Sequence, residues 1–135
     1  MFKIMPTVKR GSLTEIMFIH EAIKHDFVVF RPFVEQSEVD FIISKDLKIL
    51  FRVQVKTAFR VTETFFKCDA RIRSRPINLP DLSIIDYFSF YLPVRNVFFN
   101  VPTLSMPLSA SFTLGYRHRL NSKYFYYQDN WDFIK

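Results

Sequence analysis

The chain has 135 residues and a mass of 16.2 kDa, which suffices for one domain with a sizeable core but not for two independent domains. Hydrophobic residues make up 49% of the chain, with 17 Phe and only 2 Gly, which excludes a disordered or low-complexity protein. The net charge of +6 and the pI near 9.6 favour a polyanionic partner such as nucleic acid.

The first predicted element is a helix over residues 12–25. Its apolar residues recur at helical spacing, and Ser12 is a typical N-cap residue. Three runs of strand-forming residues follow at 27–31, 39–43 and 48–57, and a short polar link joins the last two. The first half is therefore predicted to be a helix followed by an antiparallel β-meander.

The second half is predicted to be mostly β. Residues 65–72 alternate apolar with polar side chains, which predicts a strand with one buried face and one mostly basic face. Further strands are expected at residues 87–92, 96–101 and 111–114. The aromatic tail from residue 124 is expected to close the fold, in a helical conformation.

Cysteine content and end sequences bear on where the protein works. A lone Cys68 excludes an internal disulfide and a thiolate metal cage, which fits a reducing intracellular compartment, either cytoplasm or nucleoid. Residues 1–6 lack the apolar core of a secretory signal. Residues 96–116 carry no charge, but their prolines and asparagines suit strands broken by turns, so we expect no membrane partner.

Positive charge is concentrated in residues 52–75. This window holds seven Lys and Arg against two Asp and Glu, and therefore contributes +5 of the total +6. Basic side chains spaced along a strand and the following loop can track phosphates or enter the major groove. The candidate DNA-binding residues are Arg60, Lys67, Arg71, Arg73 and Arg75.

Four residues carry the candidate chemistry: Glu15, Asp40, Gln54 and Lys56. Phosphodiester hydrolysis requires carboxylates that hold a divalent metal and a cation that stabilises the developing charge. Because strand side chains alternate between faces, Gln54 and Lys56 project from the same face. Asp40, on the adjacent hairpin strand, can lie beside them.

These residues also have ordinary structural interpretations. Ser12 and Glu15 match a capping box, in which the Glu15 carboxylate would accept a hydrogen bond from the N-cap amide. Gln54 and Lys56 are typical of a solvated strand face. Asp40 differs, because an unpaired acid next to an apolar strand is costly, and a metal is a suitable partner for it.

The order of these residues resembles the PD-(D/E)xK nuclease superfamily, in which an acid on the first helix precedes an Asp on the second strand and an acid-x-Lys on the third. Two positions depart from the pattern: Val39 replaces the proline of the motif name, and Gln54 replaces an acid. The Gln-x-Lys run in a short basic chain resembles homing endonucleases encoded in group I introns. The resemblance implies an α/β fold with a restriction-endonuclease-like core, a mixed central β-sheet flanked by helices, and a single nuclease domain over residues 1–135.

The resemblance also implies a site and an activity. Mg²⁺ would be held by Asp40 and Glu15, with Gln54 and the Val55 backbone carbonyl as further ligands, while Lys56 orients the attacking water. Gln54 supplies one negative charge fewer than an acid, which bears on metal affinity and number. The activity implied is site-specific cleavage of double-stranded DNA by a dimer or tetramer, since one active site cuts one strand.

Other functions remain open on the sequence alone. A Holliday-junction resolvase is a similarly small basic nuclease, although resolvases normally keep the acid at the position of Gln54. A non-catalytic DNA-binding protein could retain the same fold. An interaction module could use its basic strip to bind an acidic protein.

Overall fold

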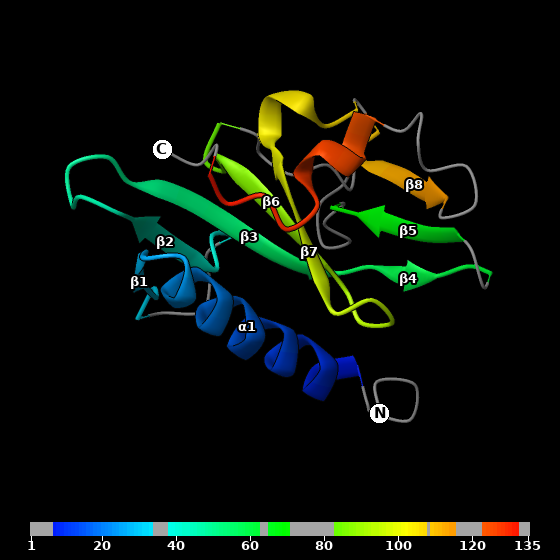
Figure 1. Cartoon of the computed structure of the whole chain (residues 1–135), viewed down its shortest axis with the longest axis horizontal. Helices are drawn as coiled ribbons and strands as arrows, with labels where there is room; N and C mark the ends of the chain where they lie inside the picture. The colour runs from blue at the N-terminus through cyan, green and yellow to red at the C-terminus, as the bar shows by residue number, and fades with distance from the viewer. Residues whose placement is uncertain are drawn as a thin grey trace.

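A computed structural model describes residues 7–33, 38–62, 65–70, 83–107, 109–115 and 123–132. Helix α1 (Thr7–Lys24) runs along one side of a five-stranded sheet, and a smaller sheet lies beyond it (Figure 1). The strands of the large sheet are β1 (Val28–Phe30), β2 (Phe41–Ser44), β3 (Phe51–Thr57), β6 (Tyr87–Leu92) and β7 (Val97–Pro102).

The large sheet is mixed. Strands β1, β2 and β3 form the predicted antiparallel meander, β3 pairs with β6 in parallel, and β6 and β7 form an antiparallel hairpin. The parallel pairing of β3 with β6 requires a crossover, and two strands of the small sheet, β4 and β5, lie within that connection, whereas its third strand, β8, follows β7. The α/β class with a mixed central sheet is thus confirmed.

The small sheet was not predicted as a separate unit. It has the order β4-β5-β8, with β4 (Phe59–Arg60), β5 (Phe65–Asp69) and β8 (Ser111–Gly115). Strand β5 covers residues 65–69 of the strand expected at 65–72, of which residues 71 and 72 lie outside the described residues, and β8 matches the strand expected at 111–114. The two strands pair with each other and not with the large sheet. Strand β4 escaped prediction because two residues carry no readable alternation.

Helix α1 begins earlier than predicted. It starts at Thr7, so Ser12 lies inside the helix and cannot be its N-cap. The capping box of Ser12 and Glu15 is therefore wrong. A glycine inside a helix costs about 1 kcal/mol relative to alanine, and here Gly11 is accommodated without ending the helix.

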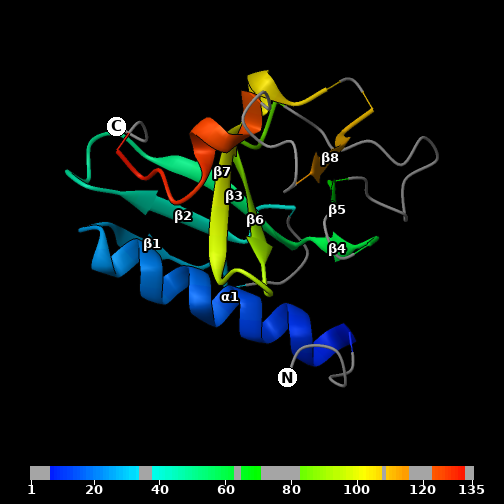
Figure 2. The same ribbon diagram turned by 45° about the vertical axis from the view of Figure 1, so that its right-hand side comes forward.

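Each face of the large sheet is buried by a different layer. On one face, Phe18 of α1 stacks on Phe41, with ring centroids 5.4 Å apart, and packs with Val53 and Val55 of β3. On the other face, a second cluster joins Phe88 and Phe90 of β6 and Phe99 of β7 to buried side chains of the small sheet. Within the described ranges there is one α-helix, so the expectation of flanking helices holds for one face only (Figure 2).

The remaining short elements close the fold. The 3₁₀ helices η2 (Thr103–Ser105) and η4 (Lys123–Tyr127) follow β7 and precede the C-terminal segment. The tail thus forms a 3₁₀ turn where a helix was expected, and Trp131 is buried against α1. Cys68 is also buried, as expected for a core thiol. Within the part of the chain that is described, no helix is long and apolar enough to cross a membrane.

Candidate active site

The start of β2 places Asp40 against β3. Its N–H donates to the Val53 carbonyl at 2.9 Å, which continues the ladder that pairs Phe41 with Val53. Its Oδ2 then accepts the Val55 N–H at 2.7 Å. The carboxylate therefore takes up a backbone donor of β3 and is held beside the Gln-x-Lys segment.

The electrostatic environment of Asp40 disfavours its charge. Burial is the largest effect and, despite the Val55 N–H that lowers it, raises the pKa of Asp40 from 3.8 to about 6. The negative charge of Glu15 raises this pKa further, whereas the positive charges of Lys56 and Arg31 lower it. The structure thus brings Glu15, Asp40 and Lys56 together, as the sequence predicted.

Glu15 reaches this site from α1. The buried Thr14 before it shares a hydrogen bond of 2.8 Å with Thr57, the last residue of β3, and so fixes this turn of the helix against the strand. The Glu15 Oε2 accepts a hydrogen bond of 3.2 Å from Arg31 Nη2. The carboxylate thus accepts a hydrogen bond from Arg31 in place of the expected bond from the N-cap amide.

Arg31 was missed by sequence reasoning. It follows β1, and its guanidinium carbon lies 5.9 Å from the centre of the Phe41 ring. The pairing of Phe30 with Ile42 places the next residue, Arg31, beside the start of β2, where Asp40 lies. Its position at the end of a predicted strand was the only sequence feature that could have drawn attention to Arg31. Its contact with Glu15 depends on the packing of α1 on the sheet.

Gln54 is the predicted site residue that has a buried polar atom without a hydrogen-bond partner. Its side chain is only 7% exposed, and its Oε1 is buried without a hydrogen-bond partner. A buried amide oxygen that accepts no hydrogen bond loses its hydration without compensation, at a cost of about 1–3 kcal/mol. Such an atom suits a role as ligand to a cation or acceptor for an ordered water.

These donors fit a divalent cation that prefers oxygen ligands. A carboxylate raised in pKa by burial gains most from a nearby positive charge, and the Gln54 Oε1 offers a neutral oxygen. In the described residues, no group of three or more Asp, Glu, His or Cys side chains could hold a metal ion. A cation here would therefore rely on the two carboxylates, Glu15 and Asp40, together with neutral oxygens.

Part of the basic window is used inside the protein. Arg52 donates from Nε and Nη2 to the Asp86 carboxylate, both at 3.0 Å. This pair holds the start of β3 to the turn before β6, so Arg52 serves the fold.

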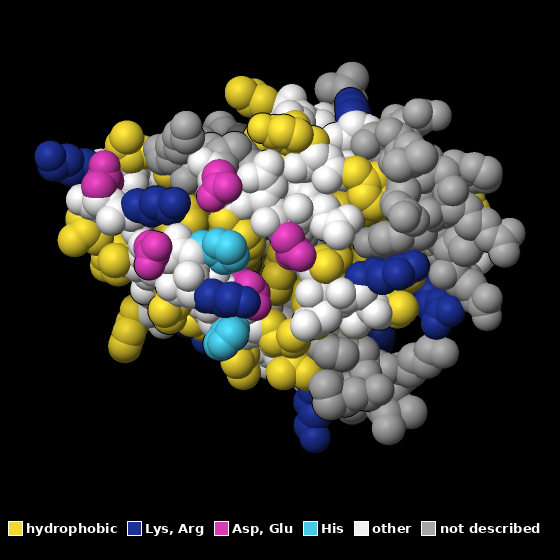
Figure 3. Space-filling view, viewed as in Figure 1, with side chains coloured by type: hydrophobic (Ala, Val, Ile, Leu, Met, Phe, Trp, Pro, Cys, Tyr) yellow, Lys and Arg dark blue, Asp and Glu magenta, His cyan; other side chains and the backbone are white. Residues whose placement is uncertain are grey.

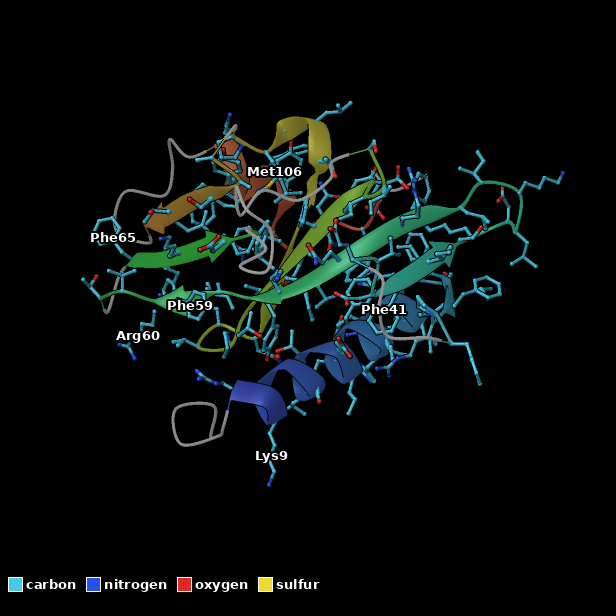
Figure 4. The ribbon with its side chains drawn as sticks, turned by 180° about the vertical axis from the view of Figure 1, so that it is seen from behind. Lys9, Phe41, Phe59, Arg60, Phe65 and Met106 are labelled. Carbon is cyan, nitrogen blue, oxygen red and sulfur yellow. The ribbon has the colours of Figure 1, made fainter. Side chains whose placement is uncertain are left out.

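The predicted DNA-binding residues divide into two groups. Arg60 is exposed on β4, and Lys67 is partly exposed on β5. Phe59 pairs with Lys67 and Arg60 with Phe66, so the two basic side chains start from opposite faces of the small sheet. Figure 4 shows Phe59, Arg60 and Phe65 together at the outer end of that sheet. Arg71, Arg73 and Arg75 lie outside the described residues.

Among the described residues, the face of the molecule that Figure 3 shows has no continuous basic surface. In Figure 3, Lys and Arg side chains over the C-terminal end of α1 are interspersed with Asp, Glu and His. Mixed charge of this kind attracts a phosphate backbone weakly compared with a basic stripe. The outer end of the small sheet is the better candidate for a DNA contact.

The fold and the site together define a restriction-endonuclease-like α/β protein. The family described as PD-(D/E)XK endonuclease matches residues 5–134, so the chain belongs to this family. The predicted resemblance is thereby confirmed.

Two solved structures share the fold. One, a bacterial homing endonuclease named I-Ssp6803I, is 20% identical with a TM-score of 0.81, and the match covers 96% of this chain and 93% of that one. The other is the Holliday junction resolvase Hjc from the archaeal hyperthermophile Archaeoglobus fulgidus. It is 16% identical with a TM-score of 0.52, and the match covers 78% of this chain and 84% of that one. A search of curated protein sequences gave no significant match.

Proposed function

We propose that the chain is a site-specific endonuclease that uses Mg²⁺ to cleave double-stranded DNA, in the manner of intron-type homing endonucleases. The observation that carries this proposal is the state of Asp40, a buried carboxylate whose pKa is raised by Glu15 and lowered by Lys56, while the Oε1 of Gln54, two residues before Lys56 on β3, is buried without a partner. In a purely structural site, Asp40 would have a direct bidentate partner, as Asp86 has in Arg52, and the Gln54 Oε1 would accept a hydrogen bond. The likeness in fold to a structure described as a homing endonuclease supports the same reading.

The residues would divide the work as follows. Asp40 and Glu15 would hold the cation with Gln54 and the Val55 carbonyl, and the bound cation would stabilise negative charge on the scissile phosphate. Lys56 lies close enough to Asp40 to lower the pKa of that carboxyl. Its ammonium can orient the attacking water and stabilise charge on the phosphate oxygens.

The expected partners are double-stranded DNA, inside the cell, and further copies of this chain. Each copy offers one set of these residues and would cut one strand, so cutting both strands requires a dimer, and a tetramer would extend the DNA contact. Arg60 and Lys67, with Arg71, Arg73 and Arg75, would supply phosphate and groove contacts.

Cleavage assays with matched variants test the proposal. Purified protein is incubated with supercoiled plasmid carrying a candidate intron-insertion site, with Mg²⁺ or with EDTA. Wild type should cut only with Mg²⁺, and Asp40→Asn and Lys56→Met should each lower the rate by about a thousandfold or more. Lys48→Met removes an exposed lysine from the β2–β3 turn and should cut like wild type.

The rival functions give different results in the same assay. The similarity to a Holliday junction resolvase makes four-way junctions the necessary second substrate. Cleavage of junctions with intact linear sites would replace the homing function by a resolvase function. Binding of DNA without any cleavage would contradict catalysis and leave a DNA-binding protein of the same fold.

A further inference from the structure

The charges of the candidate active site cancel before any cation enters. Glu15 and Asp40 can supply two negative charges, and Arg31 and Lys56 supply two positive ones. Gln54 adds none, where an acid would have left the site negative. Counted over these described residues, the site has no net negative charge to attract a divalent cation unless one of the basic side chains moves.

Arg31 is the basic side chain best placed to move. It is bonded to the Glu15 carboxylate at 3.2 Å, with its side chain 52% exposed. It also lies near enough to Asp40 to lower the pKa of that carboxyl. Half-exposed ion pairs are worth little, at most about 1 kcal/mol, so the bond to Glu15 is easily exchanged for another.

We propose that Arg31 is a built-in counter-cation that holds Glu15 while DNA is absent and thereby keeps the metal affinity of the free protein low. A DNA phosphate then takes the guanidinium, and the released Glu15 joins Asp40 in binding the cation. This inference rests on the proposed function. It makes Arg31 a positioning residue that acts through Glu15.

The chemistry of arginine suits this exchange. A guanidinium binds phosphate oxygens with two parallel hydrogen bonds, so it can leave a carboxylate for a phosphate without losing its charge partner. The guanidinium carbon lies 5.9 Å from the centre of the Phe41 ring, so the tip of the side chain also has an aromatic neighbour beside the site. Because coupling between two binding events is reciprocal, DNA should tighten metal binding and metal should tighten DNA binding.

Titration with Ca²⁺ alone tests the first half of the proposal. Isothermal titration calorimetry on the DNA-free protein should show that Arg31→Met binds Ca²⁺ about tenfold more tightly than wild type, because a positive charge next to the site is removed. Arg31→Lys keeps that charge and should retain weak binding. Lys48→Met is the matched control, since it removes a charge from the β2–β3 turn, at the opposite end of that hairpin from Asp40, and should not change the affinity.

Two outcomes separate this proposal from the proposed function. If Asp40→Asn abolishes Ca²⁺ binding but Arg31→Met and Arg31→Gln bind as weakly as wild type, Arg31 only ties α1 to β1 and the inference is overturned. If Ca²⁺ binding survives Asp40→Asn, or is absent from every variant at millimolar Ca²⁺, the metal site itself is wrong. Thermal unfolding of each variant shows whether any change in affinity reflects a loss of folding.

Adding DNA tests the second half. A short duplex at low salt should increase the Ca²⁺ affinity of wild type more than that of Arg31→Met, so that the two proteins become similar. Equal tightening of both proteins would show that the phosphate does not take Arg31, and would overturn the exchange.

Discussion

Two aspartates each accept a hydrogen bond from a backbone N–H of strand β3, but their pKa values are shifted in opposite directions. The Asp40 Oδ2 accepts the N–H of Val55, and the Asp86 Oδ2 accepts the N–H of Arg52, both at 2.7 Å. Asp86 also receives both guanidinium bonds of Arg52 at 3.0 Å. No such bidentate pair to Asp40 is seen in the described residues.

The pKa values of the two carboxyls follow from this difference. Burial raises the pKa of Asp86, but the hydrogen bonds and charge of Arg52 outweigh it and bring the pKa below its usual value. Burial of Asp40 is not outweighed, and its pKa is about 6. Asp86 is therefore stabilised in its charged form by a bidentate partner, whereas the charged form of Asp40 stays disfavoured by burial and would gain most from a bound cation. Such a cost to stability is typical of functional sites.

The largest expected effect is a gain of stability on neutralising Asp40. Since its folded pKa lies above its unfolded value of 3.8, the stability that protonated Asp40 confers is lost as pH rises from about 4 through about 6. Asp40→Asn should thus match wild type near pH 4 and exceed it by about 3 kcal/mol near pH 8 without metal. Urea unfolding in EDTA measures this gap, and a gap that does not grow with pH would contradict the assignment.

Asp86 should behave in the opposite way. Asp86→Asn leaves the Arg52 guanidinium without its carboxylate and should destabilise the protein by about 2 kcal/mol near neutral pH. Because the folded pKa of Asp86 is lowered, this loss should shrink as pH falls below the unfolded pKa of 3.8. Denaturant unfolding at two pH values measures it. Stabilisation by this variant would break the contrast with Asp40.

An acid at position 54 should increase the affinity of the site for a divalent cation. If the side chain at position 54 is a cation ligand, Gln54→Glu adds a third carboxylate and should tighten Ca²⁺ binding about tenfold, or about 1.4 kcal/mol. Gln54→Met removes the unpartnered oxygen and should weaken binding instead. Calorimetric titration compares the three proteins, and equal affinity in all of them would exclude position 54 from the cation site.

The smallest effects are expected on the small sheet. Arg60→Ala and Lys67→Ala should each weaken DNA binding a few-fold and lower the slope of log affinity against log salt by about 1, as expected for single phosphate contacts. Fluorescence anisotropy over a range of salt concentrations gives that slope. Because the two side chains start from opposite faces, a change for one residue alone would identify the face that meets DNA.

The sequence predicted the parts of the site that rest on local pattern. The hairpin of β2 and β3, the shared face of Gln54 and Lys56, and the position of Asp40 all follow from strand alternation and a short connection. The start of α1 was misplaced because Ser12 has the chemistry of an N-cap, while continued backbone hydrogen bonding carries the helix past Gly11.

Long-range features could not be read from the chain. The bond of Arg31 to Glu15 joins residues 16 positions apart, through the packing of α1 on the sheet. The pairing of Arg52 with Asp86 spans 34 positions and depends on the parallel alignment of β3 with β6. The separate small sheet likewise depends on pairing between β5 and β8, which are distant in sequence.

The central claim is that Asp40 is a ligand of a divalent cation, and stabilisation of the folded protein by Mg²⁺ tests it most directly. The thermal unfolding of wild type, Asp40→Asn and Asp86→Asn is compared near pH 8 with EDTA and with Mg²⁺ raised to tens of millimolar, because a weakly bound ligand that binds only the folded state raises its stability only above its dissociation constant. Mg²⁺ should raise the unfolding temperature of wild type and Asp86→Asn and leave that of Asp40→Asn unchanged. An equal rise in all three proteins, or none in wild type, would contradict the account.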